Sequence, residues 1–165
     1  MKVLVTGTST GIGRGIAEKF LAEGHTVIGL DVAESTIAHE NYAHYIADVA
    51  CPEQLPAVEG VEILINNAGV QDSGRDIDVN LRGTIYCTEK YGIQPNIKSI
   101  VMTASVSAHN GAEFPEYCAS KGGVLAYTKN VALRVAKYGA TCNSISAGGV
   151  ITELNAHILE NPALW

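Results

Sequence analysis

The residues with the clearest chemical potential are a tyrosine and a lysine four positions apart in the stretch YCASK, residues 117–121. Positions four apart lie on one face of a helix, so the phenol of Tyr117 and the ammonium of Lys121 can point into the same pocket. A free tyrosine has a pKa of about 10, and a nearby cation favours the phenolate and lowers that pKa toward neutrality. Tyr117 is therefore a candidate acid–base group. Because the same spacing is common on exposed helices, a solvated pair remains the alternative on this motif alone.

A serine hydroxyl precedes this pair. Ser105 lies 12 residues before Tyr117, just beyond an apolar strand expected to end near Thr103. Side chains at the carboxyl end of a parallel strand face the ligand crevice, so Ser105 and Tyr117 are predicted to lie at one edge of the sheet. His109 lies between them and could line the same pocket, although an exposed loop histidine is the favoured interpretation.

A second chemical signal is the glycine-rich stretch TGTSTGIG, residues 6–13, with Gly7, Gly11 and Gly13 directly after a short apolar run. Such a turn exposes backbone N–H groups at a helix N-terminus, which favours a pyrophosphate, although ordinary turns also contain glycines. Asp31 lies 18 residues after Gly13, where a carboxylate can accept hydrogen bonds from the adenosine ribose and would repel a 2′-phosphate. The pattern predicts NAD rather than NADP, the alternative for Asp31 being a solvated acid at a strand end.

The elements that position these residues alternate along the chain. Apolar runs typical of strands occur at 2–6, 26–30, 43–47, 62–65, 98–103 and 141–146, and helical patterns occur at 11–23, 76–91 and 115–138. Alternation of this kind predicts an α/β fold with a doubly wound parallel sheet and helices on both faces. We expect a single domain over residues 1–165.

Composition restricts the class of ligand. The chain has 165 residues, of which 47% are apolar and 17% are charged. This length and apolar content are enough for one well-buried core. The net charge is −6, with 11 basic residues against 17 acidic ones, so we expect no nucleic-acid partner and no membrane partner. A small-molecule substrate is predicted.

The cysteines and histidines predict no metal site. Cys51, Cys87, Cys118 and Cys142 lack C-x-x-C spacing, so they are interpreted as reduced thiols in a cytoplasmic protein. No two histidines are four positions apart, the spacing of a helical metal-ligand pair. Also, no apolar run is long enough to span a membrane, and no signal peptide is expected.

Taken together, the motifs resemble those of the short-chain dehydrogenase/reductase family. The stretches that carry the resemblance follow family order and cover nearly the whole chain: TGTSTGIG (6–13), Asp31, Asp48-Val49, NNAG (66–69), DVNLRG with Asn80, TASVSA with Ser105, and YCASK (117–121). The resemblance implies an NAD(P)-dependent oxidoreductase with a Rossmann-like sheet of strand order 3-2-1-4-5-6, in which the family's final strand is expected to be absent.

The resemblance also implies a role for each motif residue. Tyr117 would exchange the proton with the alcohol or carbonyl oxygen, and Ser105 would hydrogen-bond the same oxygen. Lys121 would bind the nicotinamide ribose and tune Tyr117, and Asn80 would support a water-mediated relay toward Lys121. The implied cofactor-binding residues are Gly7, Ser9, Thr10, Gly11, Ile12, Gly13, Asp31, Asp48, Val49, Asn67, Ala68, Gly69, Tyr117, Lys121, Gly148, Val150 and Thr152.

The sequence departs from the family pattern in three places. The segments from Asp31 to Asp48 and from residue 69 to Asn80 are short, and Ala147-Gly148-Gly149 stands where members usually carry Pro-Gly. The chain ends at Trp165, so most of the wall of the substrate pocket is expected to be missing. The last residues form an apolar-rich tail, which together with an edge position of the sixth strand predicts a homo-oligomer, a dimer or a tetramer.

Three functions follow from the sequence. The favoured one is a dehydrogenase that transfers a hydride between NAD(H) and a secondary alcohol or ketone. The second is an NADPH-type carbonyl or 3-oxoacyl thioester reductase, although such enzymes usually carry a basic residue near the glycine loop. The third is a truncated, non-catalytic NAD-binding module.

Overall fold

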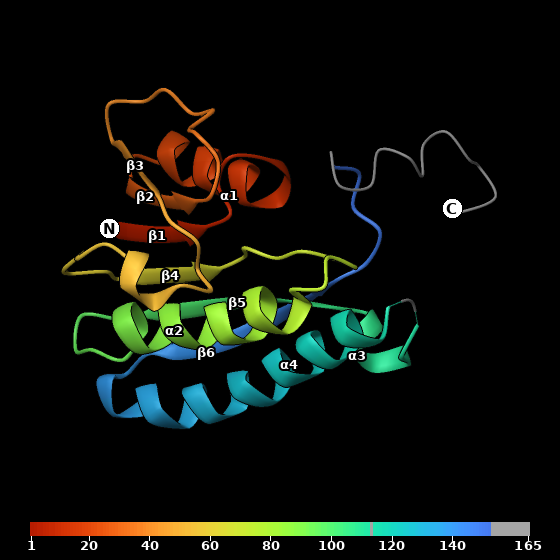
Figure 1. Ribbon diagram of the computed structural model, residues 1–165. Coiled ribbons are helices and arrows are strands. Elements are labelled where there is room, and N and C mark those ends of the chain that lie inside the picture. The colour runs from red at the N-terminus through yellow and green to blue at the C-terminus, as the bar shows by residue number, and fades with distance from the viewer. Residues whose placement is uncertain (113, 153–165) are drawn as a thin grey trace.

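The computed structural model describes residues 1–112 and 114–152, and this part of the chain contains one six-stranded parallel sheet (Figure 1). The strand order is β3-β2-β1-β4-β5-β6, as predicted. The strands are β1 (Lys2–Thr6), β2 (Thr26–Asp31), β3 (Tyr42–Ile46), β4 (Ile63–Asn66), β5 (Ser99–Ser105) and β6 (Thr141–Ala147). Because all the strands are parallel, their carboxyl ends meet at one edge, and the predicted motifs lie at that edge.

The helices cover both faces of the sheet. Helix α1 (Gly11–Ala22) packs on one face, and α2 (Thr84–Cys87) and α4 (Pro115–Val135) pack on the other (Figure 1). The predicted helix over 76–91 consists of α2 flanked by two π-helical segments, Ile77–Gly83 and Thr88–Gly92. Short 3₁₀ turns occupy Pro52–Gln54 and Ala136–Tyr138, and a short helix, α3 (Ser107–Asn110), follows β5.

The core has two layers because successive strand residues point to opposite faces. Val3 and Val5 of β1 pack with Leu21 of α1, whereas Leu4 belongs to the larger cluster that includes Val124 of α4. All of these side chains are buried. The central strands are covered on both faces, which explains why they are continuous apolar runs in the sequence.

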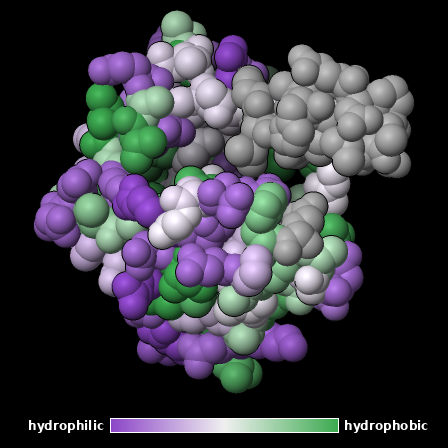
Figure 2. Space-filling model, turned by 45° about the vertical axis from the view of Figure 1, so that its right-hand side comes forward, coloured by the Kyte–Doolittle hydropathy of each residue, from purple (hydrophilic) through white to green (hydrophobic). Residues whose placement is uncertain are grey.

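Both edges of the sheet carry exposed apolar side chains. Ile46 on β3 and Ile145 on β6 are exposed, and β6 lies at the edge as predicted. Figure 2 shows the apolar residues of one face as separate patches among hydrophilic residues. The predicted apolar tail begins at Val150 and Ile151, which are exposed, but the rest of it (153–165) lies outside the described residues, so the homo-oligomer stays a prediction. In the described part of the chain, no helix has the length and apolar character needed to cross a membrane.

The end of β5 corrects one prediction. The strand was expected to end near Thr103 with Ser105 just beyond it, but β5 continues through Ser105. The reason is pairing with the edge strand, because Ser105 pairs with Ala147 and the ladder extends to the end of β6. His109 lies on α3 rather than in a loop, and its exposed ring is hydrogen-bonded to the hydroxyl of Ser146 at 2.9 Å.

Two glycines of α1 provide a matched stability test. A Cβ atom at Gly13 would overlap the carbonyl of Gly7 and approach Nδ2 of Asn67 to 2.5 Å, whereas a Cβ atom at Gly15 would meet nothing. We expect Gly13→Ala to lower the free energy of unfolding by about 3 kcal/mol, because the clash is with backbone. Gly15→Ala should raise it by about 0.5–1 kcal/mol, since alanine is the better helix residue. Urea unfolding measures both, and a Gly13→Ala variant as stable as the unmodified protein would contradict this packing.

Candidate active site

The glycine loop joins β1 to α1 at the carboxyl edge of the sheet. Gly7 and Gly11 have φ angles of +75° and +54°, a region that favours glycine. Thr10, the N-cap residue of α1, makes no side-chain capping hydrogen bond, and the first turn of the helix contains no acidic residue. The loop therefore presents a helix N-terminus suited to an anion.

The turn after β4 is packed against this loop. The hydroxyl of Thr6 accepts hydrogen bonds from the backbone N–H groups of Asn67 and Ala68, each at 3.0 Å. Nδ2 of Asn67 donates to the carbonyl of Thr6 at 3.1 Å. Thr6 was not among the predicted site residues, although it is the first residue of the TGTSTGIG stretch and the last of β1.

Asp31 is the last residue of β2 and faces the glycine loop. Its Oδ2 accepts a hydrogen bond from the N–H of Ser9 at 2.9 Å, and its Oδ1 accepts one from the N–H of Ala33 at 3.0 Å. Each carboxylate oxygen can accept a second hydrogen bond. The carboxylate is thus held in place by backbone groups and keeps acceptor capacity.

Asp48 and Val49 have different environments. Oδ2 of Asp48 forms an ion pair with Arg75 at 2.7 Å, and its Oδ1 accepts from the N–H of Ala50 at 2.9 Å. Burial raises the pKa of Asp48, but the hydrogen bonds from Arg75 and Ala50 outweigh burial, so the pKa is lowered overall. Val49 is buried and packs against Gly83, so only its backbone can face a ligand. Arg75 was not among the predicted site residues.

Tyr117 and Lys121 lie together on α4, as their spacing predicted. Nζ of Lys121 is 5.8 Å from the centroid of the Tyr117 ring and donates a hydrogen bond to the carbonyl of Thr103 at 2.8 Å. Only 4% of Lys121 is exposed. Burial lowers the pKa of Lys121 from 10.5 to about 8, and attraction to Asp76 partly opposes this effect.

Ser105 is close to this pair along β5. It is buried at the carboxyl end of the strand, two residues beyond the carbonyl that holds Lys121. Its hydroxyl oxygen accepts a hydrogen bond from the N–H of Ser107 at 3.1 Å. Accepting this bond does not use the hydroxyl's own proton, so the hydroxyl can still act as a donor.

Asn80 is fully buried and links two elements of the site. Its Oδ1 accepts from the N–H of Val70 at 2.8 Å, and its Nδ2 donates to the carbonyl of Val70 at 2.9 Å and to the hydroxyl of Ser120 at 3.0 Å. Both amide hydrogens are therefore used within the protein. Asn80 lies in a π-helical segment, a feature that is frequent at functional sites.

Asp76 is a site residue that the sequence interpretation missed. Only 1% of it is exposed, and its carboxylate accepts hydrogen bonds from the N–H groups of Asp72 at 3.0 Å and Ser73 at 2.9 Å. Its charge favours the ammonium form of Lys121. The signal in the sequence was its spacing, one helical turn before Asn80.

A cleft of about 480 Å³ brings together segments distant in the sequence. The chain after β6 runs toward the N-terminal end of α1 (Figure 1). Four predicted cofactor-binding residues line this cleft: Gly11, Ile12, Val150 and Thr152. Gly148, which precedes this segment, is exposed.

A doubly wound parallel sheet with a glycine loop after β1 and an acid at the end of β2 defines a dinucleotide-binding fold of the Rossmann class. The sequence profile of the short chain dehydrogenase family matches residues 1–163. The chain therefore belongs to the short chain dehydrogenase family and is an oxidoreductase.

Curated relatives and solved structures agree with this assignment. The chain is 30% identical to short chain dehydrogenase adrF of Penicillium roqueforti, a match covering 99% of this chain and 74% of the relative. It is 31% identical to the 3-oxoacyl-(acyl-carrier-protein) reductase FabG of Vibrio cholerae, over 92% of this chain and 74% of that protein.

Among solved structures, aldohexose dehydrogenase of Thermoplasma acidophilum matches with a TM-score of 0.80 and 30% identity, over 99% of this chain and 74% of that one. A Brucella melitensis 3-oxoacyl-(acyl-carrier protein) reductase in complex with NAD matches with a TM-score of 0.83 and 27% identity. The match covers 98% of this chain and 78% of that one.

The buried ammonium predicts a pH-dependent stability cost. In the folded protein Lys121 loses its proton above about pH 8, whereas the unfolded chain keeps it up to about pH 10.5. The cost of burying the charge is therefore complete below pH 8 and disappears as the pH rises from 8 to 10.5. Lys121→Met should raise the free energy of unfolding at pH 7 by about 2 kcal/mol, which is the burial cost less a lost hydrogen bond of about 1 kcal/mol.

Denaturant unfolding between pH 7 and 10.5 measures this effect, and the advantage of Lys121→Met should shrink across that range. Lys129→Met on the exposed side of the same helix is the control and should show no such trend. A stability difference independent of pH would show that the ammonium is not destabilised by burial.

Proposed function

We propose that this chain is an NAD(H)-dependent dehydrogenase that acts on a secondary alcohol or its ketone, with Tyr117 as the acid–base group. The observation that carries the proposal is the buried ammonium of Lys121, which the carbonyl of Thr103 holds beside the Tyr117 ring at the carboxyl end of β5. A buried cation at that place favours the phenolate of a neighbouring tyrosine.

The residues of the glycine loop fit a dinucleotide. Cβ atoms at Gly7 and Gly13 would occupy space that the packed turn at Asn67 already fills, and the N-terminus of α1 is free of acidic side chains in its first turn. Gly7, Gly11 and Gly13 would hold the pyrophosphate, and Asp31 would accept hydrogen bonds from the adenosine ribose. When bound, NAD accepts a hydride from the alcohol carbon.

The protein side chains then supply proton transfer and orientation. The phenolate of Tyr117 takes the proton of the substrate hydroxyl as general base, and the hydroxyl of Ser105 donates a hydrogen bond to the same oxygen. Lys121 keeps the phenolate form accessible near neutral pH. Asn80 joins the chain at Val70 to Ser120 on α4 and so keeps the elements around Lys121 in register.

A specific observation favours a second candidate, a 3-oxoacyl thioester reductase. FabG of Vibrio cholerae and the Brucella melitensis structure carry that name. Against it stands the carboxylate of Asp31 beside the glycine loop, which would repel the 2′-phosphate of NADPH. A panel of secondary alcohols with NAD, run beside a 3-oxoacyl thioester with NADPH, separates the two, and turnover of neither would favour a non-catalytic NAD-binding module.

The charge of Asp31 predicts the choice of cofactor. NAD should bind at least about tenfold more tightly than NADP, a difference of about 1.4 kcal/mol. Asp31→Ala should narrow this gap. Asp31→Asn, which keeps the shape but removes the charge and one of the two acceptor oxygens, should narrow it as well. Calorimetric titration with both cofactors measures the ratio. Equal affinities in the unmodified protein would refute the assignment of NAD.

The proposed acid–base role is tested by removing one hydroxyl. Tyr117→Phe should reduce turnover by at least about 10³-fold and leave NAD affinity near its original value, because the variant loses proton transfer but little binding. Lys121→Ala should lower both turnover and NAD affinity. Tyr127→Phe, which loses a hydroxyl bonded to Glu89 elsewhere on α4, is the matched control and should keep normal turnover. Substantial activity in Tyr117→Phe would assign the phenol a structural role.

A further inference from the structure

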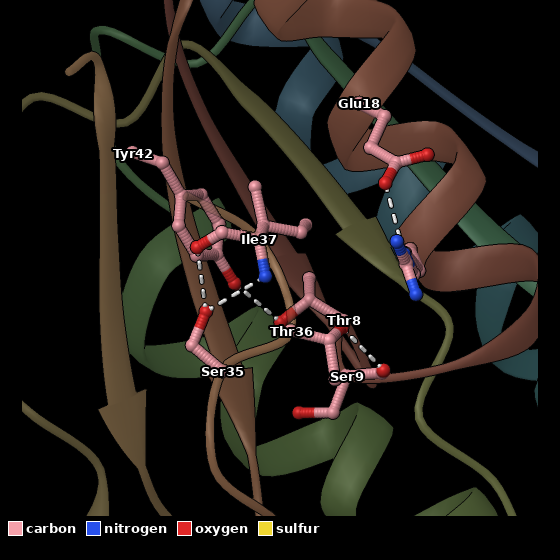
Figure 3. Close-up of polar contacts among 8 residues, drawn as sticks. Thr8, Ser9, Glu18, Ser35, Thr36, Ile37 and Tyr42 are labelled. Carbon is pink, nitrogen blue, oxygen red and sulfur yellow. Dashed lines mark hydrogen bonds and ion pairs between the residues drawn. The ribbon is translucent and has the colours of Figure 1, made fainter. Parts of the chain in front are cut away.

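The backbone of Ser9 in the glycine loop is held on several sides by the chain that follows β2. Its N–H donates to Asp31 at 2.9 Å, its hydroxyl donates to the carbonyl of Ala33 at 3.3 Å, and its carbonyl accepts from the hydroxyl of Thr36 at 2.7 Å. Figure 3 shows the residues around Thr36 lying against Thr8 and Ser9. Residues 33–37, which we call the strap, thus fix one side of the loop.

A second connection reaches the loop from the edge strand β3. The hydroxyl of Tyr42 is hydrogen-bonded to the hydroxyl of Thr8 at 2.8 Å and to Nδ1 of His44 at 3.0 Å (Figure 3 shows Tyr42 and Thr8). Nε2 of His44 donates to the carbonyl of Ala33 at 2.9 Å. A continuous chain of hydrogen bonds therefore joins the loop, β3 and the strap.

A glycine in β2 makes room for this chain of hydrogen bonds. The hydroxyls of Tyr42 and Thr8 occupy the space where a side chain at Gly29 of β2 would lie, and a Cβ atom there would overlap the Tyr42 hydroxyl. Burial raises the pKa of Tyr42, so the hydroxyl keeps its proton at neutral pH and remains a donor. The connection between β3 and the loop thus requires Gly29 as well as Tyr42.

We propose that Tyr42, His44 and Thr36 are positioning residues that set the affinity for NAD and its preference over NADP. The proposal rests on the proposed function, because it assumes that the glycine loop and Asp31 hold a dinucleotide. These three side chains need not touch the cofactor. They hold the strap and the loop together, and the strap and loop in turn supply the two N–H groups that orient the Asp31 carboxylate.

The physical reason is preorganisation. A carboxylate discriminates against a 2′-phosphate only while it is held facing the ribose site, and a loop that is already ordered loses less entropy when the ligand binds. Loosening the strap allows the carboxylate to turn away. Affinity for NAD then falls, and affinity for NADP falls less.

Tyr42→Phe tests the proposal because it removes the hydroxyl and keeps the ring. We expect the dissociation constant of NAD to rise about tenfold and the ratio of NADP to NAD dissociation constants to fall. In kinetics the KM for NAD should rise by a similar factor while kcat at saturating NAD stays within about twofold, since the groups around Lys121 are untouched. Tyr91→Phe, which loses a hydroxyl bonded to the carbonyl of Pro56, is the matched control and should change neither value.

A second pair of variants separates positioning from a general loss of stability. Thr36→Val removes the hydroxyl at nearly constant shape and should raise the dissociation constant of NAD. Thr36→Ser keeps the hydroxyl, so its dissociation constant for NAD should equal that of the unmodified protein. Calorimetry with NAD and NADP is done on each variant after thermal unfolding shows that it is folded. Unchanged NAD affinity and an unchanged cofactor ratio in both Tyr42→Phe and Thr36→Val would overturn this inference but leave the proposed function standing. Failure of the unmodified protein to bind either cofactor would overturn the proposed function and this inference with it.

Discussion

The burial of one charge, the ammonium of Lys121, is the constraint on which the arrangement of the site depends. A buried cation is unfavourable unless polar groups offset the cost. Here the carbonyl of Thr103 accepts a hydrogen bond from the ammonium and the charge of Asp76 attracts it, which offsets part of that cost. Thr103 contributes because β5 passes directly beneath α4, and Asp76 contributes because the adjoining π-helical segment brings it close. The side-chain amide of Asn80 donates a hydrogen bond to Ser120 and so joins that segment to α4, the helix that carries the ammonium.

Contact between backbones supplies the second constraint, and it places the glycine loop. Gly13 of α1 lies against the carbonyl of Gly7 and the amide of Asn67, at a distance that excludes any side chain. Thr6 bonds the same turn through its hydroxyl. Helix α1 is thereby brought close to β1 and β4, and its N-terminus opens on the cleft that Val150 also lines. The two constraints meet at the turn after β4, where Gly69 lies near both Asn80 and Lys121.

The sequence predicted the features that depend on local pattern. The alternation of apolar runs indicated a parallel sheet, and the spacing of Tyr117 and Lys121 placed both on one helix face. Features that depend on contacts between distant segments were missed. The extension of β5 to Ser105 depends on pairing with β6, and the π-helical segments around α2 have no recognised pattern in the residues. Asp76 was missed in the same way: its spacing from Asn80 was visible, but its burial and its effect on Lys121 depend on how distant segments pack.

The two ends of the site are controlled by different physics. At Lys121 the important quantity is the free energy of a buried charge, and in the proposed function this charge acts on a substrate through the proton of the neighbouring phenol. At Ser9 it is a set of hydrogen bonds that order a partly exposed loop, which changes affinity without changing protonation. The two networks share no side chain. One is built on β5, α4 and the π-helical segment that carries Asn80, and the other on the glycine loop, β2, β3 and the strap. Under the proposal the two effects are therefore separate: substitutions in β3 should alter the choice of dinucleotide while the groups proposed to move the proton keep their places.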